Sequence, residues 1–385
     1  MNPPRAFFYV QHLLGIGHLK RAAALARACA AQGMQVTLAS GGVPVPGIAP
    51  DGVRLVQLPP VRAGDTGFKT LLDAEDRPIG DAWKKARAQA LLAAWRKAAA
   101  QVLVLELYPF GRRQMRFELL PLLEAAAAAP RRPAIVCSVR DILGGLRNEE
   151  RQREAADLIG RYFDRVLVHG DAAVMPFERT FPAAARIADR ITYTGYVVGP
   201  AASCGEAGRD EVVVSAGGGA VGAQLLEAAL LAKPLSVMRD HRWRVLAGDQ
   251  LPDAEFRRLA NLAEGDPGVV LERSRTDFTA LLANCALSVS QAGYNTLMET
   301  VCAGARAVVV PFAGGRETEQ VLRARCFAER GLVEVIEEAE LAPQVLAAAI
   351  DRVTGRPRPA PGAIDLGGGK RSAELIRGLA VERAT

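Results

Sequence analysis

The pattern with the clearest chemistry runs from residue 287 to residue 312 and reads LSVSQAGYNTLMETVCAGARAVVVPF. An apolar strand is predicted to end near Ser290, and a helix to begin at about Tyr294. Gly293, between them, allows a tight turn and lets a ligand approach the backbone closely. The first amide groups of a helix have no partner within it, so together with the helix dipole they attract anions. The segment therefore predicts a site for a diphosphate.

Polar side chains around this helix start could complete a nucleotide site. Ser290, Asn295 and Thr296 add hydroxyl and amide donors. Glu299 lies one helical turn further on, where its carboxylate can accept both hydroxyl protons of a ribose diol. The same residues also suit a purely structural role, in which Ser290 or Asn295 caps the helix and the dipole favours Glu299.

A second segment, residues 314–320, follows the apolar strand that is predicted to end at Val310. Ligands of open α/β sheets bind beyond the carboxyl ends of the strands, which is where this segment would lie. Glu319 and Gln320 could hydrogen-bond the hydroxyl groups of a sugar there. An ordinary loop followed by a helix start explains the same residues equally well.

Gly217, Gly219 and Gly222 match the pattern G-x-G-x-x-G after a predicted strand and before a predicted helix. Asp240 lies downstream at about the 20-residue spacing of an acid that binds ribose in dinucleotide folds. An oxidoreductase that uses NAD(P) is therefore one alternative. Against it, glycines in such a loop, Gly218 included, serve any diphosphate, and a dinucleotide leaves residues 290–320 without a role.

A glycine-containing loop, with Gly15 and Gly17, leads into the first helix, which we predict at residues 19–31. His18 is expected just before this helix. The positive end of the helix dipole disfavours an imidazolium there, so His18 suits a neutral general base at about pH 7. The alternative is a polar residue at a helix start with no chemical role.

Two further segments carry charge in suggestive places. Glu106, Arg112 and Arg113 follow a predicted strand, and the arginines could bind an anionic acceptor or form a solvated basic face. Residues 83–99 place lysines and arginines beside tryptophans and leucines. Such a helix could lie on a membrane surface, although an ordinary surface helix fits the pattern as well.

The elements that must position these residues alternate between short apolar strands and longer helical stretches. Strands are predicted at residues 6–10, 35–39, 102–105, 134–138, 165–168, 211–215, 287–289 and 307–310. This alternation is typical of parallel sheets, so the predicted fold class is α/β, with two doubly wound, Rossmann-like domains. We divide the chain into an N-terminal domain at 1–197, a linker at 198–210 and a C-terminal domain at 211–385. A final helix from about residue 371 could pack back on the N-terminal domain.

The composition limits the function classes. The chain has 385 residues, a net charge of +6 and an apolar fraction of 50%, which is ordinary for globular domains. Its arginines are scattered without a nucleic-acid-binding motif, so we expect no nucleic-acid partner. No two of its six cysteines have C-x-x-C spacing, and neither a His/Cys cluster nor an Asp-x-Asp motif indicates a metal. Without a secretory signal or an apolar run of ~18 residues, the expected location is the cytoplasm.

These motifs together resemble the donor-binding half of glycosyltransferase family 28, whose type member makes lipid II in peptidoglycan synthesis. The resemblance rests on Ser290, Gly293, Glu299, Gly304, Pro311, Phe312, Glu319 and Gln320. The loop at residues 15–18 resembles the glycine-rich N-terminal loop of that family. Most of the chain is also similar to bacterial proteins identified as predicted glycosyltransferases, which share GIGHL(K/R)R, EL(Y/F)PFGRR and SAGGGAVG.

The resemblance implies a GT-B fold with the active site between the domains, and a role for each matching residue. Glu299 would bind the ribose, and Ser290, Gly293 and Thr296 would form the diphosphate-binding helix start. Gln320 would contact the sugar, whereas Glu319 stands where the family has a second glutamine, and the loop at Gly217 lacks the serine of the family. His18 would contact or deprotonate the acceptor.

The predicted function is transfer of a hexosyl or N-acetylhexosaminyl group from a nucleotide-diphospho-sugar, a UDP-sugar by resemblance, to a hydroxyl acceptor. Inversion at the anomeric carbon is implied by the family, and no metal or other cofactor is expected. The modest basic charge leaves open an anionic or lipid-linked acceptor and a peripheral contact at the inner face of the membrane. The alternatives are a nucleotide-sugar hydrolase with a similar Gly-x-Gly-His loop, the NAD(P)-dependent oxidoreductase, and a binding protein that has lost turnover.

Overall fold

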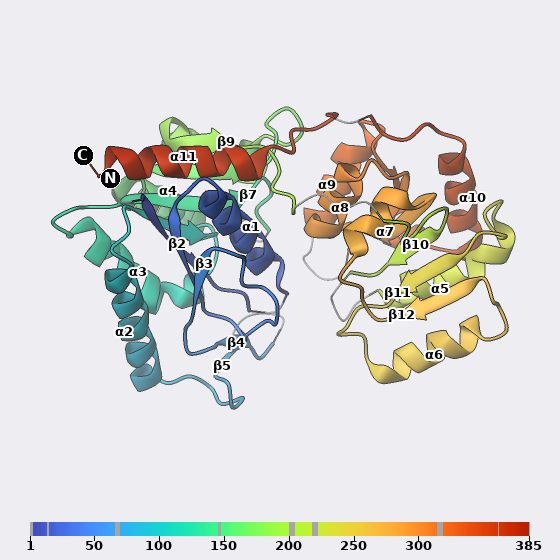
Figure 1. Ribbon diagram of the computed structural model, residues 1–385, viewed down its shortest axis with the longest axis horizontal. Helices are drawn as coiled ribbons and strands as arrows, with labels where there is room; N and C mark the ends of the chain where they lie inside the picture. Colours follow the sequence, from blue (N-terminus) through green and yellow to red (C-terminus); the bar gives the residue numbers. More distant parts are fainter. Residues whose placement is uncertain are drawn as a thin grey trace. The chain divides into compact units, whose positions relative to one another are not determined.

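The computed structural model describes residues 3–13, 15–65, 70–144, 148–199, 205–217, 222–313, 319–360 and 362–384. It divides into two compact units, one made of Met1–Val197 with Asp365–Thr385 and the other of Val198–Ile364. Each unit is a parallel sheet with helices on both faces (Figure 1). The predicted class of two Rossmann-like α/β domains is confirmed.

The first unit is built on a seven-stranded sheet in the order β3-β2-β1-β6-β7-β8-β9, with all neighbouring strands parallel. In chain order its strands are β1 (Arg5–Val10), β2 (Gln35–Ser40), β3 (Val53–Gln57), β6 (Val102–Glu106), β7 (Ala134–Arg140), β8 (Arg165–His169) and β9 (Ile191–Tyr193). A separate antiparallel pair joins β4 (Arg62–Ala63) and β5 (Leu71–Leu72). The inner strands are almost continuous apolar runs because helices bury both faces. Polar side chains therefore gather at the strand ends.

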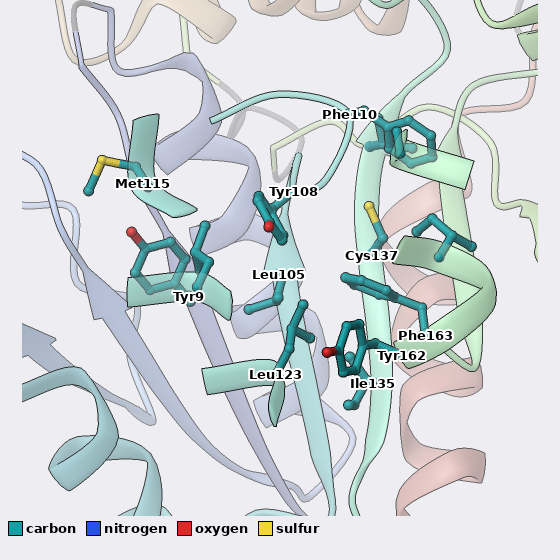
Figure 2. Close-up of a cluster of buried hydrophobic side chains, with 14 of the residues drawn as sticks. Tyr9, Leu105, Tyr108, Phe110, Met115, Leu123, Ile135, Cys137, Tyr162 and Phe163 are labelled. Atoms are coloured by element: carbon teal, nitrogen blue, oxygen red, sulfur yellow. The ribbon is translucent and has the colours of Figure 1, made fainter. Parts of the chain in front are cut away.

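Helices α1 (Gly17–Ala31) and α11 (Gly368–Glu382) cover one face of this sheet, where Leu19 and Ile376 pack with residues of β1 and β6. Helices α2 (Asp81–Ala98), α3 (Arg116–Ala127) and α4 (Glu149–Tyr162) cover the other face. Figure 2 shows part of this second core, with Tyr9 and Leu105 from the sheet and Leu123 from α3. Short 3-10 helices complete the unit: η1 (Arg113–Met115), η2 (Phe177–Arg179) and η3 (Pro182–Arg190).

Helix α2 packs its apolar side on the first unit, as expected of an ordinary surface helix. Leu91 and Trp95 lie in the core of the first unit, so the apolar side of the helix is already covered. Arg87 is fully buried and pairs with Glu118 of α3 at 2.7 Å, which ties the two helices together. Within the described part of the chain, no helix is long and apolar enough to cross a bilayer.

The second unit contains a six-stranded parallel sheet in the order β12-β11-β10-β13-β14-β15. Its strands are β10 (Val212–Ser215), β11 (Trp243–Leu246), β12 (Val269–Glu272), β13 (Leu287–Gln291), β14 (Ala307–Val310) and β15 (Glu334–Val335). Helices α5 (Ala223–Ala232), α6 (Asp253–Ala263) and α10 (Pro343–Thr354) pack on one face, and α7 (Phe278–Asn284) packs on the other. The remaining helices are α8 (Tyr294–Cys302), α9 (Glu319–Ala328), η4 (Lys233–Leu235) and η5 (Glu338–Glu340).

The chain leaves the first unit after Val197 and returns to it at Asp365. The two connecting segments are hydrogen-bonded to each other, from Tyr196 N to Asp365 O at 2.7 Å and from Gly368 N to Tyr196 O at 3.1 Å. Gly368 must be a glycine, because a Cβ there would overlap the carbonyl oxygen of Gly195. The sequence-based division ended the second domain at residue 385 but expected the final helix to be able to pack back on the N-terminal domain. The structure places that helix, α11, in the first unit.

Candidate functional site

His18 and Glu106 meet at the carboxyl edge of the first sheet. His18 Nδ1 lies 2.9 Å from Glu106 Oε1, with 14% of the His18 side chain exposed and only 3% of the Glu106 side chain. Glu106 is the last residue of β6, and His18 is the second residue of α1. The prediction that His18 precedes the helix was therefore wrong. Its ring lies beside the helix start, and the neighbouring strand supplies its partner.

Glu106 is held in its ionised form by three donors. Arg21, one turn beyond His18 on α1, pairs with Oε1, and Ser138 Oγ donates to Oε2 at 2.6 Å. Burial alone would raise the pKa of Glu106, but the Arg21 charge and the hydrogen bonds from His18 and Ser138 outweigh it. The pKa therefore lies well below its usual range. Ser138 can reach the carboxylate because β6 and β7 pair with Glu106 opposite Ser138.

His18 is neutral at about pH 7. Burial lowers its pKa to about 3; the hydrogen bond to Glu106 works against this shift, whereas the charges of Arg112, Arg140 and Arg21 add to it. Because the Glu106 carboxylate can only accept, the 2.9 Å contact requires a hydrogen on His18 Nδ1. The lone pair of the neutral ring then lies on Nε2, where a base needs it. Burial, rather than the helix dipole, is thus the main cause of the neutral ring.

Arg112 and Arg113 were predicted to share one role, but they lie in different surroundings. Arg112 has left-handed backbone angles, with φ 60°, and its Nε donates to Gln11 O at 2.7 Å beyond the end of β1. Burial lowers its pKa to about 10, and its charge acts on His18. Arg113 is 59% exposed and lies 3.4 Å from Glu154 on the surface. Only Arg112 therefore belongs to the neighbourhood of His18.

The glycines of the N-terminal loop differ from each other. Gly15 is exposed, and a Cβ built on it would meet nothing within 4 Å, so open space lies beside its backbone. Gly17 is already the first residue of α1. Leu14 lies outside the described residues.

In the second unit, the predicted helix start is the N-terminus of α8. Its N-cap residue is Gly293, which has no side chain, so neither Ser290 nor Asn295 is the capping residue, and the structural alternative is wrong on this point. The first backbone bond runs from Leu297 N to Gly293 O at 2.9 Å, which leaves the amides of residues 294–296 outside the helical pattern. Gly293 has φ −60°, so it is not needed for a left-handed turn, but a Cβ on it would stand in open space.

The side chains near this helix start differ in exposure. Asn295, Thr296 and Glu299 are half-buried, and their spacing places Glu299 on the same side of α8 as the other two. Ser290 is fully buried near the end of β13, and its Oγ has no hydrogen-bond partner among the described residues. An unpaired buried hydroxyl costs about 1–3 kcal/mol, which is a reason to look for a partner that binds there.

The glycine-rich loop after β10 lies next to this helix start. Ser215, the last residue of β10, pairs in register with Ser290 of β13, and its Oγ accepts from Gly217 N at 3.1 Å. Gly217 has φ 75°, and Gly222, the N-cap of α5, has φ 114° with a virtual Cβ 2.6 Å from Ala216 Cβ. Both positions therefore require glycine. Gly218 and Gly219 lie outside the described residues.

Glu319 and Gln320 begin α9, but they make different contacts. Glu319 is buried and pairs with Arg323, one turn along the helix, at 3.0 Å. Gln320 Oε1 accepts from Phe312 N at 3.1 Å just beyond β14, which leaves its amide group as a donor. Gln320 thus keeps its candidate role toward a sugar, while an ion pair already engages Glu319. Residues 314–318 lie outside the described part of the chain.

Comparison with known proteins agrees with this geometry. Residues 213–361, from β10 to the end of the second unit, match the model of the glycosyltransferase family 28 C-terminal domain. The second unit is therefore similar to the C-terminal domain of that family. An N-acetylglucosamine transferase of Brucella canis, named for UDP-N-acetylglucosamine and N-acetylmuramyl-(pentapeptide) pyrophosphoryl-undecaprenol, is 29% identical over 142 residues. That alignment covers 36% of this chain and 37% of the length of the relative.

Two solved structures resemble nearly the whole chain. MurG of Acinetobacter baumannii has a TM-score of 0.57 at 16% identity, covering 99% of this chain and 100% of its own. Os79 from O. sativa, solved in complex with UDP, has a TM-score of 0.61 at 14% identity, covering 98% and 94%. At such identities the likeness shows the fold alone. It confirms the predicted GT-B class, and the family 28 domain confirms the predicted resemblance.

The dinucleotide interpretation fails on the position of Asp240. This residue is exposed and lies just before β11, which begins at Trp243. Because β10 and β11 are parallel, Asp240 sits at the amino edge of the sheet, opposite to the edge that carries Gly217 and the start of α8. An acid that binds ribose in dinucleotide folds lies at the carboxyl edge. The spacing of Asp240 in the sequence fits a ribose-binding acid, but the edge of the sheet at which Asp240 lies does not.

Sequence reasoning missed Arg21, Ser138 and Arg140 near His18. Ser138 was the last residue of a predicted strand, and Arg140 follows it closely. A polar residue at the carboxyl end of an apolar strand was therefore a usable signal. Arg21 lies three residues after His18, a spacing that puts both on one side of a helix. For metals, the described residues contain no group of three or more His, Cys, Asp and Glu side chains that could hold an ion.

Proposed function

We propose that the protein is a glycosyltransferase that moves a sugar from a UDP-sugar to a hydroxyl acceptor. The observation that carries this proposal is the start of α8, where no N-cap side chain occupies the first amides and Glu299 follows one turn later. The loop at Gly217 borders the same site. A diphosphate fits the amides and the glycine backbone, and a ribose diol fits the carboxylate. The names of the Brucella canis relative and of the Os79 complex, which include UDP, support this nucleotide.

In the proposed reaction, His18 acts as the general base. An acceptor hydroxyl loses its proton to His18 Nε2 while its oxygen forms a bond to the anomeric carbon of the sugar. The bond between that carbon and the diphosphate oxygen breaks at the same time, with inversion. Glu106 holds the ring through Nδ1 and stabilises the imidazolium that results, as a carboxylate does in a catalytic triad.

The leaving UDP carries its new negative charge to the start of α8. Its amides and the helix dipole stabilise that charge, so we propose that the reaction needs no divalent cation. Gln320, through its amide group, is the described residue best placed to contact the donor sugar.

Arg112 indicates which kind of acceptor would bind beside His18. Its partly buried charge lies beside His18 and suits a carboxylate or phosphate on the acceptor. An anionic, lipid-linked molecule that is met at the inner face of a membrane has this chemistry, and the Brucella canis relative is named for an acceptor of this kind, N-acetylmuramyl-(pentapeptide) pyrophosphoryl-undecaprenol. A hydrolase would use the same His18 and the same donor site with water in place of the acceptor.

Thermal shift measurements with UDP, other nucleoside diphosphates and NAD(P) test the proposal. At about 100 times its dissociation constant, a ligand adds about 2.7 kcal/mol to the free energy of unfolding, so the Tm should rise clearly with UDP. It should not rise with NAD or NADP, because Asp240 lies at the wrong edge of the sheet for a dinucleotide. Stabilisation by NAD(P) without any by a nucleoside diphosphate would overturn the proposal.

A further inference from the structure

A line of buried polar side chains continues from Glu106 across the first sheet, away from His18. Ser138, His169 and Thr194 are each at most 1% exposed. Ser138 Oγ lies 2.6 Å from Glu106 Oε2 and 2.9 Å from His169 Nε2. His169 Nδ1 in turn lies 2.9 Å from Thr194 Oγ1. Glu106 and His169 are the last residues of β6 and β8, Ser138 lies within β7, and Thr194 directly follows β9. The line therefore crosses neighbouring strands of the sheet.

The position of each hydrogen in this line follows from the ionised Glu106. A carboxylate only accepts, so the single hydroxyl hydrogen of Ser138 points to Glu106 Oε2. Ser138 Oγ must then accept from His169, which places a hydrogen on His169 Nε2. Burial lowers the pKa of His169 to about 3, so its ring is neutral and Nδ1 carries no hydrogen. Thr194 therefore donates to His169 Nδ1, and every hydrogen bond in the line points toward Glu106.

This direction matters because the carboxylate is fixed at both oxygens. Arg21 holds Oε1 and Ser138 holds Oε2, so the plane of the Glu106 carboxyl group is set. The remaining acceptor direction of Oε1 faces His18 Nδ1. Arg21 Nη2 also lies 3.1 Å from His18 Nδ1, and a bare Nδ1 could accept from it. That second tautomer would put the hydrogen on Nε2 and leave the ring without a lone pair for a substrate.

We propose that Ser138, His169 and Thr194 are positioning residues that select the His18 tautomer with its hydrogen on Nδ1 by fixing the Glu106 carboxylate. This inference rests on the proposed role of His18 as the base. Without the Ser138 hydrogen bond, the carboxyl group can rotate about its own axis, and Arg21 can compete for His18 Nδ1. The line thus keeps Nε2 available for the acceptor proton.

Nitrogen NMR of the histidine side chains tests the tautomers without a substrate. The chain has only four histidines, so single substitutions assign every ring signal. In the ¹⁵N-labelled full chain, we expect His18 as the Nδ1–H tautomer and His169 as the Nε2–H tautomer, both neutral from about pH 5 to 8. In Ser138→Ala, the Nε2–H form of His18 should become populated. An Nε2–H form of His18 in the wild type, or a Ser138→Ala spectrum unchanged at His18, would overturn the proposal.

Turnover of a UDP-sugar, measured beside UDP affinity, separates positioning from simple stabilisation. Ser138→Ala should lower kcat roughly ten-fold and leave the Kd of UDP unchanged, because the lost hydrogen bond to a charged group belongs to the first unit with the proposed base, whereas the proposed UDP site belongs to the second. Ser372→Ala is the matched control, since Ser372 is equally buried in the first unit but its Oγ has no partner among the described residues. This control should leave kcat and Kd unchanged.

His169 offers a rescue test. His169→Gln can keep an N–H donor toward Ser138, whereas His169→Leu cannot, so Gln should retain more of the kcat than Leu at equal Tm. If His18→Ala lowers turnover while Ser138→Ala and His169→Leu do not, the positioning role is wrong and the proposed base stands. If none of the three lowers turnover, the base assignment falls and the positioning role falls with it.

Discussion

At the scale of single residues, His18 carries the clearest expectation. His18→Ala should lower turnover by about 10²–10⁴-fold, the usual contribution of a general base, while UDP binding stays nearly intact. His18→Gln should do no better, because glutamine can hydrogen-bond Glu106 but cannot take up the proton. Donor consumption, with and without acceptor extracts, gives the turnover, and calorimetry gives the UDP affinity. Mutants that turn over donor like the wild type would reduce His18 to a structural residue.

Glu299 is the matching residue in the second unit. If its carboxylate holds the ribose diol, Glu299→Ala should weaken UDP binding by about 1.5–3 kcal/mol, the usual worth of hydrogen bonds to a charged group. Glu319→Ala is a useful contrast, since Glu319 already pairs with Arg323 and should contribute to folding more than to UDP binding. Calorimetric titration of both folded variants decides the matter. An unchanged Kd in Glu299→Ala would leave Glu299 with its helix-dipole role only.

The sequence led to some of these residues and not to others, for physical reasons. The helix start at Gly293 could be predicted because its pattern is local, a strand followed by a turn and a helix. The contacts of Glu106 with His18 and Ser138 depend on which strands are neighbours and in what register, and a single sequence does not contain that information. The Glu319–Arg323 ion pair could have been predicted from the sequence, because a carboxylate four residues before an arginine commonly pairs with it on a helix.

At the scale of elements, we expect the start of α8 to supply the positive potential that a metal ion provides in other enzymes. Its amides and dipole supply positive potential at the place where the diphosphate would leave, so turnover should persist in excess EDTA. The measurement is UDP release in the presence of EDTA, beside the same reaction with added magnesium or manganese. Activity that disappears on chelation and returns with either ion would show that the helix start is not sufficient.

Some predicted boundaries of helices and strands agree with the structure, and others do not. The strand predicted at residues 307–310 is β14, which an apolar run identifies. The helix predicted to begin at about Tyr294 does begin at Tyr294, directly after Gly293. Helix α1 begins at Gly17, two residues before its predicted start. Gly15 and Gly17 suggested a loop throughout, but glycine is tolerated in the first turn of a helix, and helix ends vary by one or two residues. This shift moved His18 from the loop into the helix.

At the scale of the whole molecule, buried neutral histidines make stability depend on pH. His18 and His169 have pKa values of about 3 in the folded chain and ordinary values when unfolded. Below about pH 6.5 the unfolded chain therefore binds more protons, and the free energy of unfolding falls by about 1.4 kcal/mol per pH unit for each histidine. This loss should continue as the pH falls toward 3.

Urea unfolding followed by tryptophan fluorescence can measure this for the first unit alone. Trp83 and Trp95 lie in that unit and Trp243 in the other, so a Trp243→Phe background removes the second signal. The midpoint should fall between about pH 7.5 and 5.5, and His169→Gln should reduce the mean slope over this range by roughly half a proton. A midpoint independent of pH over this range would contradict the burial of neutral rings.

The return of α11 to the first unit has a consequence for synthesis on the ribosome. Ala373, Ile376 and Ala380 complete the core against which α1 packs, yet they are made after all of Val198–Ile364. At about 5–20 residues per second, that interval lasts roughly 10–30 s, during which the part of the α1 and sheet surface that α11 covers stays exposed. The second unit has all its residues by then and can fold first. The first unit, although it begins the chain, is therefore the last to have all its residues, and a nascent chain that stalls before residue 373 would expose that apolar surface to a chaperone.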